Sequence, residues 1–185
     1  MIDWLYEKTG VMKSYGRGDR EYNVTDLFIC RKKKMFRDAG YKQVITVDNA
    51  LRGRVIGQLV HKGMSVLLEE DGWDTGMRLE KKVGDYLIIG KPDAVKDDVV
   101  LEIKYQRYFK EVGNVHILQT GVYLNMLGLK RGIILYVAPN AFEEVYIDRE
   151  VSDDDILWFI EHPVSPFSKW ECEYCGYRVY CDTPL

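Results

Sequence analysis

Three residues near the middle of the chain have the types and spacing for metal-dependent chemistry on phosphate esters: Asp93, Glu102 and Lys104. Side chains two positions apart on a β-strand point to the same face, so Glu102 and Lys104 share one face of the strand predicted over residues 99–105. If Asp93, at the end of the preceding predicted strand, faces the same cleft, the two carboxylates can hold Mg²⁺ or Mn²⁺. Lys104 would then orient the attacking water and stabilise the developing charge.

Residues on two predicted helices accompany this acidic-lysine pattern. His61 lies on the flank of one helix, and Gln119 and Tyr123 are four positions apart on another, which places their side chains on one helical face. Each feature has an ordinary alternative: an E-x-K sequence is commonly a solvated ion pair, His61 a core or surface histidine, and the Gln119–Tyr123 pair plain helix surface. Their common order along the chain makes them candidates.

The apolar pattern predicts an α/β chain. Helices are expected over residues 26–39, 53–70, 115–127 and 153–161, and strands over residues 77–83, 86–95, 99–105, 132–137 and 142–147. Thr25 is the expected N-cap of the first helix, with Cys30 in its second turn. Gly84-Asp85 predicts a hairpin, and the first three strands are expected to form a meander. The strand–helix–strand unit from Val99 to Gly132 predicts a mixed sheet with helices on its faces.

The composition is that of a globular protein with one domain. The chain has 185 residues, of which 46% are hydrophobic and 30% charged, and no Pro/Gly/Ser-rich linker divides it. We therefore expect residues 1–185 to form a single domain. No apolar run approaches the roughly 20 residues of a membrane span, and no signal-peptide pattern is present, so no membrane contact and a cytoplasmic location are expected. A G-x-x-x-x-G-K-[ST] loop is absent, which excludes a motor with its own ATPase.

Basic residues are concentrated in the first third of the chain. Residues 1–60 contain 12 Lys and Arg against 7 Asp and Glu, although the formal net charge of the chain is −3. The densest basic run consists of Arg31, Lys32, Lys33 and Lys34. Clustered cations attract a polyanion, so this run is a candidate DNA-binding surface, with a solvated helix face as the alternative. Phe36, Tyr41 and Tyr105 are candidates for stacking on DNA bases.

Four cysteines have an arrangement suited to a metal centre. Cys30 stands alone, and Cys172, Cys175 and Cys181 form a C-x2-C-x5-C motif. In an intracellular chain such cysteines favour a metal over a disulfide framework. By chemistry alone, a zinc site and an iron–sulfur cluster fit them about equally well.

The combined motifs resemble those of the RecB-like branch of the PD-(D/E)xK nucleases. In that branch a helical histidine precedes a strand-end aspartate, a (D/E)-x-K sequence and a Q-x-x-x-Y helix. The matching residues here are His61, Asp93, Glu102, Lys104, Gln119 and Tyr123. The resemblance implies a restriction-endonuclease-like core in which helices flank a mixed central sheet.

The resemblance also implies a role for each matching residue. The Mg²⁺ or Mn²⁺ ligands would be His61, Asp93, Glu102 and the backbone carbonyl of Ile103. Lys104 would be the catalytic lysine. Gln119 and Tyr123 would contact DNA or brace the site.

The cysteines extend the resemblance to the iron–sulfur nucleases related to RecB and AddB, whose short stand-alone members are CRISPR-associated exonucleases that act in spacer acquisition. It implies a 4Fe-4S cluster bound by Cys30, Cys172, Cys175 and Cys181, in a lid that ties the N-terminal helical region to the C-terminus. It also implies exonuclease activity on single-stranded DNA, typically from the 5′ end, that makes or trims 3′ overhangs. The CRISPR integrase complex would be a partner.

Other functions are compatible with parts of the same pattern. The family has viral and other non-CRISPR members that act in repair or recombination. A non-catalytic nucleic-acid-binding subunit is disfavoured because the predicted metal ligands and Lys104 are all intact. A zinc-stabilised structural module is a further alternative, which the colour of the purified protein would distinguish.

Overall fold

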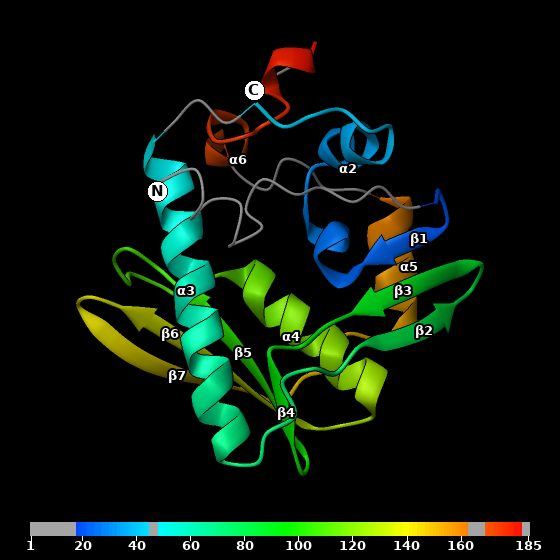
Figure 1. The fold of residues 1–185 in the computed structure, drawn as a ribbon. Helices are drawn as coiled ribbons and strands as arrows, with labels where there is room; N and C mark the ends of the chain where they lie inside the picture. The colour runs from blue at the N-terminus through cyan, green and yellow to red at the C-terminus, as the bar shows by residue number, and fades with distance from the viewer. Residues whose placement is uncertain (1–17, 45–47, 163–168, 183–185) are drawn as a thin grey trace.

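The computed structural model describes residues 18–44, 48–162 and 169–182 (Figure 1). The strands in these residues are β1 (Glu21–Asn23), β2 (Leu79–Val83), β3 (Tyr86–Gly90), β4 (Ala94–Lys96), β5 (Val99–Tyr105), β6 (Arg131–Ala138) and β7 (Ala141–Ile147). The α-helices are α2 (Arg31–Asp38), α3 (Asp48–Glu70), α4 (Asn114–Leu127), α5 (Asp153–Glu161) and α6 (Lys169–Glu173). The 3-10 helices are η1 (Val24–Phe28) and η2 (Arg178–Tyr180).

The central sheet has the strand order β4-β5-β6-β7. β5 and β6 are parallel, whereas β4 and β7 pair with them in antiparallel register, so the sheet is mixed as predicted. α4 connects the two parallel strands, which confirms the predicted strand–helix–strand unit. A second sheet has the order β1-β3-β2, with β1 parallel to β3 and β2 antiparallel to it.

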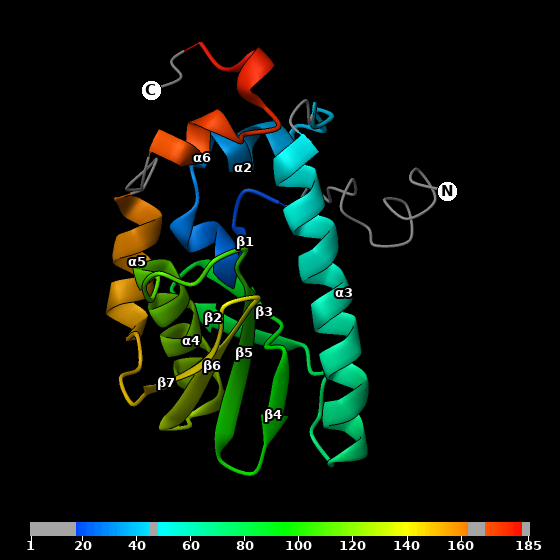
Figure 2. The same cartoon turned by 90° about the vertical axis from the view of Figure 1, so that its left-hand side faces the viewer.

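Helices cover both faces of the central sheet (Figure 2). On one face, α3 packs through Val60, Met64 and Leu68 against a cluster that contains Leu101 and Ile103 of β5. On the other face lies the larger core, in which Val100, Val122, Ile134, Tyr136 and Ile156 are fully buried. Successive side chains of β5 point to opposite faces of the sheet. Leu101 and Ile103 therefore pack on the side of α3, and Val100 packs in the larger core.

The helix predicted over residues 26–39 is wrong, because the chain forms two shorter helices there. η1 ends at Phe28, Ile29 is extended, and Cys30 is the N-cap of α2 instead of a residue in its second turn. The predicted cap Thr25 lies inside η1, which follows Asn23. The break has a tertiary cause: the buried Asp26 side chain is held by other residues, and this folds η1 back onto α2.

The predicted meander is also wrong, because the strand expected over residues 86–95 is divided between the two sheets. β3 ends at Gly90 and pairs with β1 and β2, whereas β4 begins at Ala94 and pairs with β5. Between them lies the buried Pro92, which has no amide hydrogen to donate to a sheet. The hairpin at Gly84-Asp85 is confirmed by the antiparallel pairing of β2 with β3.

The other predicted elements are present, with shifted ends. α3 begins at Asp48 rather than near Gly53, Gly128 ends α4 with φ 66°, and the Ser152 side chain caps α5. β1, α6 and η2 were not predicted. In both views α6 lies beside α2, although the two helices are far apart in the sequence (Figures 1 and 2). No helix among the described residues has the length and apolar character to cross a membrane.

Two glycines allow α4 to approach its neighbours closely. A Cβ atom on Gly132 of β6 would lie 2.6 Å from the Thr120 side chain, and one on Gly121 would lie 2.8 Å from Val151. Both distances are shorter than van der Waals contact, so a larger residue at Gly132 would push α4 away from the sheet and one at Gly121 would push it away from Val151. This close packing lets side chains of α4 reach β5.

Candidate active site

β5 brings a carboxylate and an ammonium group together under α4. Glu102 and Lys104 lie on the same side of the strand, with Lys104 Nζ 2.5 Å from Glu102 Oε1. The Glu102 side chain is only 4% exposed, whereas that of Lys104 is 18% exposed. Glu102 and Lys104 therefore share one face of the strand, as predicted. The neighbouring Leu101 and Ile103 pack on the other face, against α3.

Asp93 approaches β5 from the segment between β3 and β4. Its Oδ2 accepts a hydrogen bond of 2.7 Å from the backbone amide of Ile103. Its Oδ1 lies 3.1 Å from Nδ1 of His61 on α3. Three elements distant in the sequence thus place His61, Asp93 and Ile103 next to one another.

Gln119 and Tyr123 of α4 complete the polar cluster. Gln119 Nε2 donates to Glu102 Oε1 at 2.8 Å, and Gln119 Oε1 accepts from Lys104 Nζ at 3.0 Å. Gln119 Nε2 also lies 3.1 Å from the Tyr123 hydroxyl, which donates to the Lys91 carbonyl at 3.2 Å. Gln119 is 5% exposed and Tyr123 is 3% exposed. Both side chains are thus hydrogen-bonded within the cluster.

The environment perturbs three acid–base groups of the cluster, including Tyr123, whose pKa is raised by burial and by the charge of Glu102. Burial raises the pKa of Glu102 to about 7, a net effect in which the charge of Lys104 opposes the rise and that of Asp93 adds to it. The hydrogen bond to Asp93 raises the pKa of His61, against the opposing effect of burial. Groups perturbed by burial and by specific charges are concentrated at functional sites.

The donor atoms fit a hard divalent cation. Glu102 Oε2 is buried and has no hydrogen-bond partner among the described residues. A buried carboxylate oxygen is costly to leave unpaired, and a bound cation would supply its partner. Carboxylates from Asp93 and Glu102 with an imidazole from His61 suit Mg²⁺ or Mn²⁺. Within the residues described, no three His, Cys, Asp or Glu side chains are already gathered into a closed metal-binding group.

A cleft of about 570 Å³ opens beside this cluster. Asp93, Glu102, Gln119 and Tyr123 contribute to its lining. Thr25, Arg78 and Lys91 also line it, and the sequence motifs did not indicate them. The only signal in the sequence was the position of Lys91 two residues before Asp93, and a single basic residue is too common to be predictive.

The predicted basic run is divided between two environments. Lys34 is buried, with its Nζ 2.6 Å from Asp38 Oδ2 and 4.4 Å from the centre of the Tyr22 ring. Lys32 lies 2.5 Å from Asp182. The basic side chains of the run that reach the surface are Arg31, Lys32 and Lys33.

A second cavity, of about 20 Å³, lies where α2 meets the C-terminal segment. The four cysteines all line it: Cys30, Cys172, Cys175 and Cys181. None of them is in a disulfide, although here too the thiols have not closed into a metal-binding group in the described structure. Four thiols from the two ends of the chain around one cavity fit either zinc or an iron–sulfur cluster.

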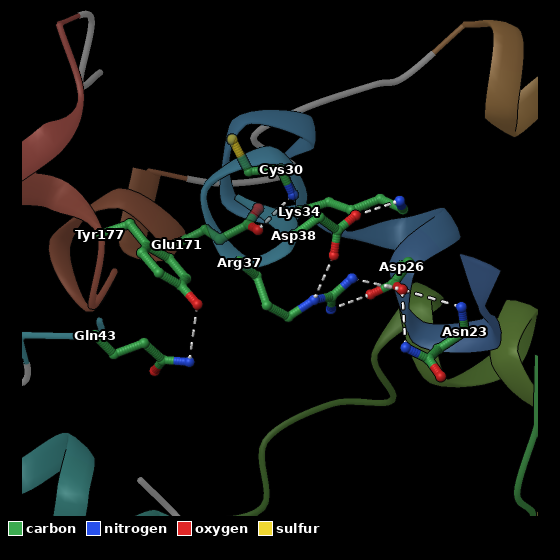
Figure 3. A network of polar contacts seen from close by, with 9 residues as sticks. All are labelled: Asn23, Asp26, Cys30, Lys34, Arg37, Asp38, Gln43, Glu171 and Tyr177. Atoms are coloured by element: carbon green, nitrogen blue, oxygen red, sulfur yellow. Dashed lines mark hydrogen bonds and ion pairs between the residues drawn. The ribbon is translucent and has the colours of Figure 1, made fainter. Parts of the chain in front are cut away.

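Polar contacts near the two ends of α2 link the cysteine cavity to the cleft (Figure 3). Glu171 Oε1 accepts a hydrogen bond of 2.8 Å from the backbone amide of Cys30. On the same helix, Arg37 holds Asp26 of η1 through two hydrogen bonds of 2.6 Å and 2.8 Å. Asp26, whose side chain is 0% exposed, also accepts from the backbone amide of Asn23, which lines the cleft. α2 therefore connects the two sites.

The aromatic residues considered for base stacking differ in accessibility. Phe36 is 9% exposed because it packs against Tyr41, Tyr177 and Tyr180. Tyr41 is 44% exposed, and Tyr105 is half-buried. Phe36 thus belongs to the packing around the cysteine cavity and does not offer a free ring to DNA.

The fold is shared with solved exonucleases. The alkaline exonuclease LHK-Exo from Laribacter hongkongensis matches with a TM-score of 0.52 and 10% sequence identity over 87% of each chain. LHK-Exo in complex with dAMP matches with a TM-score of 0.51 and 12% identity. At these identities the likeness is one of fold, and it confirms a nuclease-like α/β architecture.

Two further proteins match nearly the whole chain, with higher sequence identity than LHK-Exo. The crystal structure of SSO0001 matches with a TM-score of 0.80 and 25% identity, covering 100% of this chain and 98% of that chain. The CRISPR-associated exonuclease Cas4 of Saccharolobus solfataricus is 28% identical over 187 residues, covering 93% of this chain and 92% of that protein. No protein-family model matches the chain. The resemblance to CRISPR-associated RecB-like exonucleases is therefore confirmed.

Proposed function

We propose that this chain is a CRISPR-associated, metal-dependent DNA exonuclease that digests single-stranded ends from 5′ to 3′ and so makes or trims 3′ overhangs. The observation that carries the proposal is the state of Glu102. One of its oxygens is held by Lys104 and Gln119, and the other is buried without a partner in the described structure. The similarity of the chain to the CRISPR-associated exonuclease Cas4 supports the same activity.

The side chains of the cluster would have different roles in phosphodiester hydrolysis. His61, Asp93, Glu102 and the Ile103 carbonyl would hold Mg²⁺ or Mn²⁺. When bound, the cation supplies Lewis-acid chemistry that activates water and neutralises charge on the phosphate. Lys104, whose side chain is 18% exposed, would orient the attacking water and stabilise the charge that develops on the phosphate oxygens.

Gln119 and Tyr123 act as positioning residues in this proposal. Gln119 bonds to both Glu102 and Lys104, so it fixes the carboxylate relative to the ammonium. Tyr123 bonds to Gln119 and to the carbonyl of Lys91 at the edge of the cleft. Such supporting hydrogen bonds typically change metal affinity or activity by about 10–100-fold when they are removed.

The basic side chains of α2 that reach the surface would guide DNA towards the cleft. Arg31, Lys32 and Lys33 reach the surface of this helix, and Tyr41 follows it with an accessible ring. Clustered cations neutralise phosphates, and aromatic rings stack on unpaired bases. A single strand passing over α2 would therefore be held by both kinds of contact.

We further propose a 4Fe-4S cluster with a structural role at the cysteine cavity. The convergence of all four cysteines on one cavity and the absence of disulfides among them support this assignment. The cluster would tie α2 to the C-terminal segment within a single nuclease domain. A visible absorption spectrum of the anaerobically purified protein distinguishes it from colourless zinc.

The biological setting in this proposal follows from the class of proteins that the chain resembles. The chain would act in the cytoplasm on prespacer DNA, in contact with the CRISPR integrase complex. One alternative is a nuclease of non-CRISPR or viral DNA repair and recombination. Such a nuclease would use the same active-site residues and would differ only in its protein partners. A non-catalytic subunit is the alternative from another class.

The activity is tested with single-stranded oligonucleotides labelled at the 5′ or the 3′ end. In Mn²⁺ or Mg²⁺ we expect the 5′ label to be released first, in short products, while the 3′-labelled strand shortens stepwise. Excess EDTA should stop both reactions, and a duplex of the same sequence should be digested more slowly. Binding without any cleavage in the presence of either metal would favour the non-catalytic subunit.

A further inference from the structure

Two basic residues line the same cleft as the acidic cluster, and we infer that Arg78 and Lys91 form a phosphate-binding subsite for the DNA strand. The inference rests on the proposed nuclease function and specifies how its substrate is held. Arg78 lies just before β2, and Lys91 directly follows β3. Both residues line the cleft of about 570 Å³ that also contains Asp93 and Glu102.

Lys91 combines a fixed backbone with a free side chain. Its carbonyl accepts the hydrogen bond from the buried Tyr123 hydroxyl. It also precedes Pro92, and a residue before proline favours extended conformations. Its side chain is exposed, and the ammonium has no hydrogen-bond or ion-pair partner among the described residues. The Lys91 backbone is therefore held at the edge of the cleft, and its ammonium is available to an anion.

Arg78 is oriented by a contact that an incoming phosphate can replace. Its Nε and Nη2 atoms both donate to Glu80 Oε1, at 3.0 Å and 2.7 Å. The Arg78 and Glu80 side chains are 56% and 49% exposed, and an ion pair this exposed contributes little free energy. A guanidinium group can bind a phosphate through two parallel hydrogen bonds.

The negative charges in the cleft favour such a subsite. Asp93 and Glu102 repel the phosphates of a DNA strand, and this repulsion extends over several ångströms in a cleft partly shielded from water. Arg78 and Lys91 supply positive charge in the same cleft, next to the carboxylates. The cleft volume is within the range of about 300–1,000 Å³ typical of small-molecule sites. A nucleotide unit therefore fits, with one phosphate at the basic pair and a neighbouring one at the acidic cluster.

The test measures DNA affinity separately from cleavage. A fluorescent single-stranded oligonucleotide is titrated in EDTA at several salt concentrations with wild type, Lys91→Ala and Arg78→Ala, and with Lys130→Ala as a control. Lys130 is exposed after α4 and does not line the cleft. Each cleft variant should bind about tenfold more weakly, as expected for a charged hydrogen bond, and Lys130→Ala should bind like wild type. The salt slope of log K should become shallower by about 0.7 for each phosphate that the variant protein no longer neutralises.

Two further measurements make the assignment specific. Glu80→Gln should bind DNA more tightly than wild type, because it releases the Arg78 guanidinium. In Mn²⁺, Lys91→Ala should raise KM about tenfold and leave kcat within a factor of about three, since the lysine contacts ground state and transition state alike.

Failure of the subsite and failure of the proposed function give different results. If wild type cleaves DNA but both cleft variants keep wild-type affinity and salt slope, the subsite is wrong and the nuclease assignment stands. Equal weakening in Lys130→Ala also overturns the subsite, because it reveals a general charge effect. Wild-type protein that neither binds nor cleaves single strands overturns the proposed function itself.

Discussion

The side-chain amide of Gln119 on α4 is bonded to the buried carboxylate of Glu102 on β5, with Nε2 2.8 Å from Oε1. The amide oxygen of Gln119 accepts a hydrogen bond from Lys104. Reversing the amide would place its NH₂ group against an ammonium and its oxygen against a carboxylate, so only one orientation satisfies both neighbours. Gln119 therefore sets the position of the acid and of the lysine together.

Replacing Gln119 by methionine, which has a similar length and no hydrogen-bonding amide, should lower nuclease activity by about 10–100-fold. The cause is that the distance between Glu102 and Lys104 is no longer fixed. The measurement is kcat/KM on a labelled single strand in Mn²⁺. Asn125→Ala is the matched control, because Asn125 lies on the same helix but bonds to Lys81. Equal activity in the two variants would show that Gln119 has no positioning role.

The Asp26–Arg37 pair should be a main determinant of stability in the region that joins the cleft to the cysteine cavity. The Asp26 side chain is fully buried and that of Arg37 is 15% exposed. Removing one partner from a buried pair leaves an uncompensated charge, so Arg37→Met should reduce the free energy of unfolding by about 3–5 kcal/mol. The double variant Asp26→Asn/Arg37→Met should recover part of this stability in urea denaturation. Strictly additive effects of the two substitutions would mean that the pair is not coupled.

The Asp26–Arg37 pair shows why one part of the fold could not be predicted from the sequence, whereas other parts could. β5 and its E-x-K pattern were predictable, because alternation along one strand is a local property. The break at Ile29 and Cys30 was not, since it depends on a contact between Asp26 and Arg37 across 11 positions. The division of residues 86–95 was missed because both halves are apolar and only Pro92 marked the change of sheet.

Some residues of the candidate site could likewise be predicted from the sequence, and others could not. Residues that fall into a spaced pattern, such as Asp93, Glu102 and Gln119, could be found, and the structure brings them together. Arg78 and Lys91 enter the cleft only because β2 and β3 pair in one sheet and border it. Isolated basic residues carry no periodic signal, so tertiary structure was needed to select them.

The proposed cluster at the cysteine cavity predicts that removing one thiol affects colour, stability and activity together. Cys30→Ser should lack the brown absorbance that the proposed 4Fe-4S cluster would give the anaerobically purified protein, and should have a markedly lower melting temperature, because a metal site absent from the unfolded chain contributes its binding energy to folding. Activity should fall as well, because α2 is connected to the cleft wall through Asp26 and Asn23. Retention of a full cluster and wild-type stability in Cys30→Ser would exclude Cys30 as the fourth ligand.

His116 predicts a specific dependence of stability on pH. The Tyr136 hydroxyl oxygen accepts from the Gly113 amide at 3.0 Å and lies 2.8 Å from His116 Nδ1, a geometry in which the hydroxyl donates to a neutral imidazole. Burial, with the charge of Lys104, lowers the pKa of His116 to about 4. The unfolded chain therefore binds the proton more tightly than the folded chain does.

The contribution of this histidine is present above pH 6.5 and declines as the pH falls from 6.5 towards 4. Over that window wild type should lose up to about 3 kcal/mol more free energy of unfolding than His116→Asn, which cannot titrate. Urea denaturation of both proteins at several pH values measures the difference. Parallel pH profiles would mean that His116 is protonated with equal ease in the folded and unfolded chains.

Cleavage by Lys104→Ala compared with wild type tests the central claim most directly. Both proteins are incubated with a 5′-labelled single strand in Mn²⁺, after their absorption spectra, melting temperatures and DNA affinities have been compared. We predict that Lys104→Ala keeps the spectrum, a cooperative melting transition and most of the DNA affinity, and loses nearly all turnover, because the lysine acts mainly on the transition state. Wild-type turnover in Lys104→Ala, or undiminished cleavage by wild type in excess EDTA, would contradict the proposed active site.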